Sequence, residues 1–198
     1  MKKTLILTAS IVALTVSSFA QGNFSMVYYD GANGITIGSP ASPAATGWYL
    51  SDDYSVEAYM AAGAGQSEGS LLPIAASLMA FIVPGPTAAI TTAADGGGQW
   101  YGSVVDTGLA IGTATIQLRA WYNGGSYATY DLALAGGVNV GKSSLYDIAL
   151  KANTDPTVLD MNGIGMASFT VQAVPEPGTL VLAGLGLASL FIFRRRKN

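Results

Sequence analysis

The 198-residue sequence contains no cysteine and no histidine. The chain therefore cannot form a disulfide, a thiolate or imidazole metal site, or a Ser-His-Asp or Cys-His catalytic arrangement. Its stability has to come from packing and backbone hydrogen bonds. Phosphate-binding loops and dinucleotide fingerprints are also absent: residues 96–98 are three glycines, but no lysine follows them, which is typical of a turn. We expect no cofactor.

Positive charge is scarce between residues 21 and 173. Only Arg119, Lys142 and Lys151 lie there, against eleven acidic residues, so this segment of 153 residues has a formal charge of −8. Phosphate binding needs clustered lysine and arginine, and we therefore expect no nucleic-acid partner. The length suits one domain with a hydrophobic core and is too short for two of average size.

The N-terminus has the three parts of a secretory signal peptide. Residues 1–3 are positively charged, residues 5–16 form an uninterrupted apolar run, and Ser18 and Ala20 are the small residues that signal peptidase requires. The run is shorter than the ~20 residues of a spanning helix. The sequence predicts that residues 1–20 direct export through the Sec translocon and are removed by signal peptidase after Ala20.

The C-terminal residues 174–198 also divide into three parts. Residues 174–179 contain two prolines, which fix φ and remove backbone donors, so regular structure is interrupted there. Residues 180–193 are uncharged and mostly apolar, and we expect a single transmembrane helix over them. The basic cluster at 194–197 should stay in the cytoplasm, because positive residues favour that side of the membrane. Residues 21–173 would then lie outside the inner membrane.

This order of parts resembles the PEP-CTERM sorting domain. The resemblance implies that an exosortase, a membrane transpeptidase-like enzyme, recognises the first part and cuts near it. It also implies a bacterium that makes exopolysaccharide, and a final location at the cell surface or in a biofilm matrix. The sorting motif would be Val174, Pro175, Glu176 and Pro177, and the cytoplasmic anchor would be Arg194, Arg195, Arg196 and Lys197.

Between the two ends, short alternating segments separated by glycine-rich turns predict β-strands. In residues 113–122 the period of two predicts a core face and a solvent face. Only residues 71–80 could form a helix, and Pro73 restricts it to a short one. The predicted core face is Ala114, Ile116, Leu118, Ala120 and Tyr122, and the predicted solvent face is Thr115, Gln117, Arg119 and Trp121. The strand segments are 24–29, 35–38, 55–61, 78–83, 99–105, 113–122, 144–151 and 168–173.

About eight such strands favour an all-β domain, an antiparallel β-sandwich over residues 21–173. From about residue 52 the body also resembles a recurrent, uncharacterised β-rich type found with PEP-CTERM tails. The runs IQLRAWYNGGSYATY, GKSSLYDIAL and ASFTVQAVPEP carry this second resemblance. It implies a fold and no activity.

Each tryptophan is followed by tyrosine, at residues 48, 100 and 121. Neighbouring side chains of a strand face opposite ways, so each pair should place one ring inward and one outward. The outer rings could stack on sugars of an exopolysaccharide, or they could simply occupy a sheet face that favours aromatics. For stacking, Trp121 is the best candidate because its predicted face is exposed, followed by Trp48 and Trp100.

Acidic residues give weaker signals. Asp155, Asp160 and Asn162 offer oxygen ligands for Ca²⁺, but a valine stands eleven residues after Asp160, where a calcium-binding loop of the EF-hand type has glutamate. We therefore predict no metal site. A glycan hydrolase would need two carboxylates at a defined separation, and nothing in the sequence singles out a pair.

The sequence thus predicts a non-enzymatic structural protein of the envelope or extracellular matrix, associated with exopolysaccharide. Two alternatives stay open. The body could be a carbohydrate-binding module that uses exposed aromatic rings, or a secreted glycan hydrolase that uses a carboxylate pair.

Overall fold

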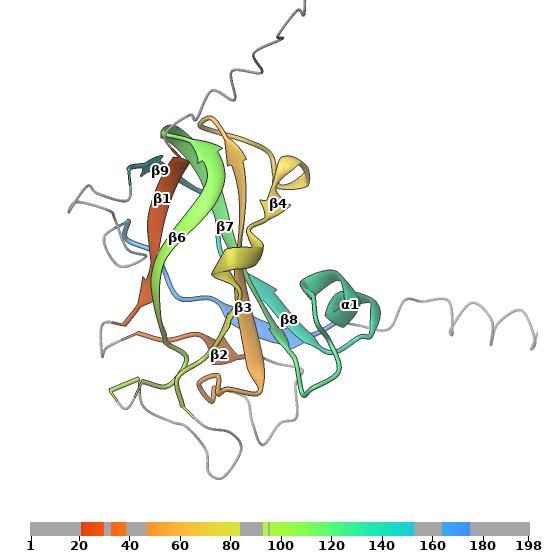
Figure 1. Ribbon diagram of the computed structural model, residues 1–198. Helices are drawn as coiled ribbons and strands as arrows, with labels where there is room; N and C mark the ends of the chain where they lie inside the picture. The colour runs from red at the N-terminus through yellow and green to blue at the C-terminus, as the bar shows by residue number, and fades with distance from the viewer. Residues whose placement is uncertain are drawn as a thin grey trace, which may run out of the picture.

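The computed structural model describes residues 21–29, 33–38, 47–83, 93–94, 96–152 and 164–174. Strands dominate these ranges, in one eight-stranded sheet and one two-stranded ribbon. The predicted all-β class is confirmed at this level (Figure 1). The predicted signal peptide and transmembrane segment lie outside the described residues. Within them, no helix has both the length and the apolar character needed to cross a bilayer.

Ten strands occur in the described part of the chain. All eight predicted segments contain a strand, and β4 and β8 are additional. The strands are β1 (Gln21–Tyr28), β2 (Thr36–Ile37), β3 (Tyr54–Ala62), β4 (Leu72–Pro73), β5 (Met79–Ala80), β6 (Trp100–Ala110), β7 (Gly112–Tyr122), β8 (Asn139–Lys142), β9 (Tyr146–Leu150) and β10 (Thr170–Ala173). The larger sheet has the order β2-β10-β8-β7-β3-β4, with β5 also on β3 and β9 also on β7. Its pairings are antiparallel except for the short parallel contact of β10 with β2.

The centre of the sheet is the antiparallel pair of β3 and β7. Nine residue pairs stay in register, from Tyr54 opposite Tyr122 to Ala62 opposite Ala114. Alternate residues of both strands face the main hydrophobic core, as the period of two predicts. These core residues are Val56, Ala58 and Met60 of β3, and Ala114, Ile116, Leu118 and Ala120 of β7.

The ribbon of β1 and β6 covers this face of the sheet. In Figure 1 the ribbon lies beside β3 and β7, with β6 nearer to them than β1. Phe24, Met26 and Tyr28 of β1 belong to the same buried cluster as the sheet residues. From β6, Trp100 is fully buried and its ring packs edge-on against Phe81, with ring centres 5.5 Å apart. The sheet and ribbon therefore form two layers of unequal width with the core between them.

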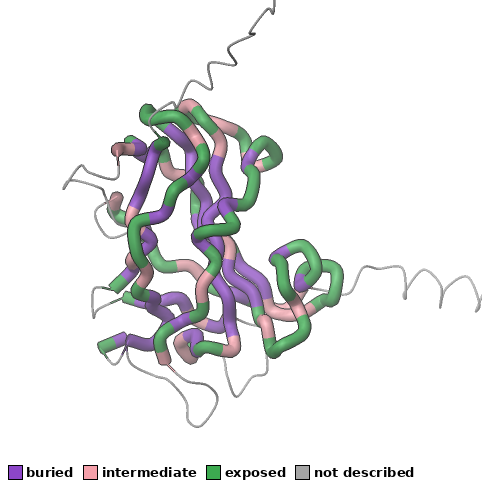
Figure 2. The backbone as a smooth tube through the Cα atoms, viewed as in Figure 1, coloured by how far each residue is buried: buried purple, intermediate pink, exposed green. Residues whose placement is uncertain are grey.

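The opposite face of the sheet is also buried, contrary to the prediction. Thr115 and Gln117 are 1% and 3% exposed, and Trp121 is fully buried. The prediction of a solvent face fails because short segments of chain cover it. A second buried cluster forms there from Tyr59, Leu71, Trp121, Tyr130, Ala133 and Val140. Accordingly, Figure 2 shows mostly buried residues along β3 and β7.

The main cover of this second face is α1 (Tyr130–Ala135), a helix that we did not predict. Thr129 caps it, because its hydroxyl accepts a hydrogen bond from the Leu132 amide at 3.3 Å. Gly136 ends it, and Tyr130 and Ala133 face the sheet. The predicted helical candidate at residues 71–80 instead holds β4, the 3-10 turn η2 (Ala75–Ser77) and β5, while a further turn, η1 (Glu68–Ser70), precedes it.

Tyr122 is also placed differently from the prediction. It was expected in the core but is 37% exposed at the end of β7. There its ring meets Tyr54 edge-on, with centres 5.4 Å apart. The alternation of β7 therefore predicts the core face correctly up to Ala120 and fails at the last residue.

Burial on both faces changes what substitutions in β7 should do. Leu118→Ala should lower the free energy of unfolding by about 2–5 kcal/mol, because it opens a cavity in the core. Gln117→Ala should lower it by about 1–3 kcal/mol, because Gln117 is buried and its amide donates to the Ser143 carbonyl oxygen at 3.2 Å. Urea unfolding of residues 21–174 measures both. Thr113→Ala, at an exposed site of the same strand, should stay within about 0.5 kcal/mol. A Gln117 variant as stable as the Thr113 variant would contradict the buried second face.

Candidate functional site: a charged cluster and the pocket beside it

The tryptophans do not form an exposed platform. Trp121 lies under α1, its Nε1 donates to the Tyr127 carbonyl oxygen at 2.8 Å, and its ring packs edge-on against Tyr130. Trp100 is fully buried, and Trp48 is half-buried against the main core. The predicted outward position of Trp121 is wrong, because α1 covers the face of the sheet on which Trp121 lies.

In two of the three pairs the tyrosine is the outer ring. Tyr101 is 75% exposed beside the buried Trp100, and Tyr122 is 37% exposed beside the buried Trp121. One ring in and one ring out is therefore confirmed for these pairs. The third pair differs, since Trp48 and Tyr49 are both half-buried.

Arg119 is the centre of a charged cluster on the second face. Its side chain is only 11% exposed, and its guanidinium lies over the Tyr59 ring, 3.9 Å from the ring centre. Its Nε donates to Oε1 of Gln117 at 3.0 Å. Stacking on an aromatic face and a side-chain acceptor together compensate for much of the water that the guanidinium loses. Glu57 stands directly opposite Arg119 in the β3–β7 register.

Glu57 and Tyr59 titrate abnormally because they are buried beside this cation. Loss of water raises the pKa of the Glu57 carboxyl, while its hydrogen bond with Tyr59 and the charge of Arg119 act in the opposite direction. Burial, with added repulsion from Glu57 and Asp131, raises the pKa of the Tyr59 hydroxyl to about 12. A carboxyl with a raised pKa is suited to general acid chemistry only where a substrate can reach it.

Glu68 connects the cluster to the surface. Its Oε1 accepts a hydrogen bond from Lys142 Nζ at 2.6 Å and lies 3.9 Å from a terminal nitrogen of Arg119. The Lys142 hydrogen bond is the main cause of a lowered Glu68 pKa. Both Glu68 and Lys142 are nearly half exposed. The pair therefore fixes η1 against β8 and neutralises the lysine charge.

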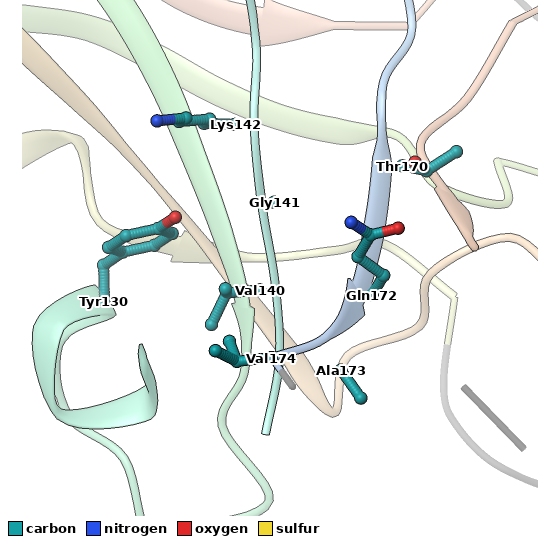
Figure 3. A pocket seen from close by; sticks show the side chains of 8 residues that line it. All are labelled: Tyr130, Val140, Gly141, Lys142, Thr170, Gln172, Ala173 and Val174. Atoms are coloured by element: carbon teal, nitrogen blue, oxygen red, sulfur yellow. The ribbon is translucent and has the colours of Figure 1, made fainter. Parts of the chain in front are cut away.

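A pocket of about 350 Å³ opens next to the cluster. In Figure 3 strand β8 forms its floor, the Tyr130 ring of α1 extends in from one side, and β10 forms the other side. Exposed Thr170 and Gln172 lie on the β10 side, so polar atoms border an apolar floor. The complete lining is Tyr130, Val140, Gly141, Lys142, Thr170, Gln172, Ala173 and Val174.

The carboxylates are placed away from this pocket. None of its lining residues is acidic, so neither Glu57 nor Glu68 lines this pocket. No three residues able to bind a metal come together among the described residues. The weak calcium candidates Asp155, Asp160 and Asn162 lie outside those residues. The same is true of Pro175, Glu176, Pro177 and of Arg194, Arg195, Arg196 and Lys197.

The tail is identified by comparison with known families. Residues 173–197 match the family described as the PEP-CTERM protein-sorting motif. The tail is a PEP-CTERM sorting motif. Such a motif indicates an exported protein with a C-terminal sorting signal and an exosortase as its processing partner. No match to the chain was found among the curated proteins or the solved structures.

The PEP-CTERM motif begins at the edge of the pocket. Val174, its first predicted residue, lines the pocket and packs against the second buried cluster. It follows β10 directly, and β10 is held to β8 by the pairs Gln172–Val140 and Ala173–Asn139. The pocket and the sorting motif are therefore adjacent parts of one surface, which the sequence did not reveal because no strand was predicted at β8.

The two glutamates of the cluster should affect stability with opposite dependence on pH. The raised pKa of Glu57 means that its ionisation opposes folding, so its contribution weakens as the pH rises above the ordinary value of 4.5. The lowered pKa of Glu68 means that its contribution is present above 4.5 and is lost as the pH falls. Relative to the parent, Glu57→Gln should gain stability as the pH rises above about 4.5, whereas Glu68→Gln should lose stability as the pH rises toward 4.5 from below and then stay constant. Urea unfolding of residues 21–174 between pH 3 and 7 tests this difference, and equal trends would contradict it.

Proposed function

We propose that the protein is an exported structural component of the cell envelope or extracellular matrix, sorted by an exosortase and associated with exopolysaccharide. In its precursor form a transmembrane helix at residues 180–193 anchors it in the inner membrane. The body lies outside the cytoplasm and reaches the cell surface or matrix after the tail is processed. It is not an enzyme.

The observation that carries the non-enzymatic role is that the charged side chains of the cluster pair with one another, and that no carboxyl group lines the pocket beside them. The Arg119 guanidinium is stacked on Tyr59, and Glu68 neutralises Lys142. Catalysis needs charged groups aimed at the position of a substrate. The two carboxyl groups of the cluster, at Glu57 and Glu68, instead interact with its cations, and neither of them lines the pocket.

The alternatives receive less support from this geometry. A carbohydrate-binding module would present several aromatic faces together to solvent, but Trp100 and Trp121 are fully buried. The exposed rings beside them, Tyr101 and Tyr122, belong to different layers. A glycan hydrolase would direct two carboxyl groups into one cleft, but the pocket lining contains no carboxyl group.

The sorting role predicts a specific defect. Replacing Pro175, Glu176 and Pro177 together with alanine should leave the tail attached and the protein in the membrane fraction, because exosortase processing needs the motif. In an exosortase-bearing host, mass spectrometry should find a C-terminal peptide ending near residue 177 in the parent only. Thr113→Ala, at an exposed site of the body and outside the motif, is the control and should be processed. A parent that keeps its intact basic tail in this host would contradict the proposal.

The proposed topology can be tested with reporters that work only outside the cytoplasm. A fusion after Ala173 should give signal, because the body is proposed to be exported. A fusion after Asn198 should give none, because the basic cluster should stay inside. Equal signals from the two fusions would exclude this orientation.

The structural role is tested in the matrix itself. Deleting the protein should reduce matrix cohesion, and the whole protein supplied in trans should restore it. The purified protein should release no reducing ends from the host's exopolysaccharide over hours of incubation. Measurable release that is lost in Glu57→Gln would establish a hydrolase instead.

A further inference from the structure

The pocket beside the sorting motif has the composition of a protein-binding surface. Its floor is apolar at Val140 and Val174, and exposed polar side chains at Thr170 and Gln172 border it. An apolar centre with a polar rim is typical of interfaces between proteins. The single cation at its edge, Lys142, is already paired with Glu68 at 2.6 Å. The pocket is therefore better suited to an uncharged, partly apolar polypeptide segment than to an acidic saccharide.

Chain length limits what can occupy the space next to this pocket. Val174 lines the pocket and is also the first residue of the motif. Three further residues, Pro175 to Pro177, extend at most about 11 Å from it, whatever their conformation. A folded domain of even 100 residues has a radius of gyration of about 13 Å. An enzyme that holds the motif in its active site is therefore kept within about 11 Å of Val174 and of the pocket that it lines.

The position of this contact surface is fixed by the sheet. Gln172 and Ala173 are paired with β8, so the start of the motif does not move independently of the pocket floor. Gly141 allows the strands to approach closely, because a Cβ there would lie 2.9 Å from the Cα of Val171. The pocket and the motif can thus be recognised as one unit.

We propose that this pocket is a second recognition surface for the exosortase, which takes an uncharged, partly apolar segment of the enzyme's extracytoplasmic surface. The proposal rests on the proposed function, since it assumes that the motif is processed. It goes further because the sorting enzyme then reads the folded body as well as the tail. Processing of this protein therefore depends on residues outside the motif.

The experiment fills the pocket without touching the motif. Gln172→Trp, in the full chain and in an exosortase-bearing host, should slow tail removal roughly fivefold to tenfold, as losing one well-packed contact does. Ser103→Trp introduces the same side chain at an exposed site of β6, in the other layer, and should be processed at the parent rate. Thr170→Trp, on the same β10 side of the pocket rim, should reproduce the slowing. Pulse-chase with mass spectrometry of the C-terminal peptide gives the rates.

A spacer between the body and the motif distinguishes a lost contact with the enzyme from a folding defect. Four residues, Gly-Ser-Gly-Ser, inserted between Ala173 and Val174 keep the motif intact and let the enzyme bind it away from the body. In that background Gln172→Trp should have no further effect on the rate, whereas a folding defect would persist. The proposal is overturned if Gln172→Trp and Ser103→Trp are processed alike, or if the slowing survives the spacer. It is also overturned if processing is normal but matrix retention falls, since the pocket would then bind polysaccharide.

The failure of this inference can be told from failure of the proposed function. If replacing Pro175, Glu176 and Pro177 with alanine blocks processing while Gln172→Trp has no effect, only the second recognition surface is lost. If that triple replacement is processed like the parent, the sorting role itself is wrong.

Discussion

The pairing of β3 with β7 is the constraint on which the rest of the structure depends. Its nine residue pairs in register place alternate side chains of both strands on the two opposite faces of the sheet. One face is buried by the β1–β6 ribbon and the other by α1 and Leu71. A strand pair that is buried on both sides cannot shift by one residue, because every side chain would move to the opposite interior. With no disulfide available, this double burial is what fixes the body's register.

The second interior contains polar side chains as well as its apolar cluster. Its stability depends on how completely these polar groups are hydrogen-bonded. Gln117 donates to the Ser143 carbonyl oxygen and accepts from Arg119. Trp121 Nε1 donates to the Tyr127 carbonyl oxygen at 2.8 Å. A buried polar group without a partner destabilises by about 1–3 kcal/mol, so these bonds mainly prevent a loss. The network also gives the covering segments defined positions, which apolar contacts alone do not.

Sequence analysis predicted the main core well and the second interior poorly. The alternation in residues 113–122 identified Ile116 and Leu118 as core, because burial against the ribbon depends on a period of two. The same alternation assigned Gln117 and Trp121 to solvent, because nothing in a strand's own sequence shows what covers its other face. The cover, α1, has only six residues, too few for a periodic signal. Thr129 as a cap, Asp131 in the first turn and the Gly136–Gly137 stop were the available indications. The PEP-CTERM motif was recognised because its order of parts is local, whereas the pocket needs β8 and β10 brought together.

The sheet also determines where sorting can begin. Because β10 is closed between β8 and β2, the first residue of the motif has a fixed position only when the body is folded. An unfolded body would present the same tripeptide on a free chain, with no pocket beside it. A substitution at Gly141 would therefore act on sorting through the displacement of β10, although it lies more than thirty residues before the motif. A sorting enzyme that contacts the pocket would discriminate between these two states, and folding of the body would then become a condition for release of the tail.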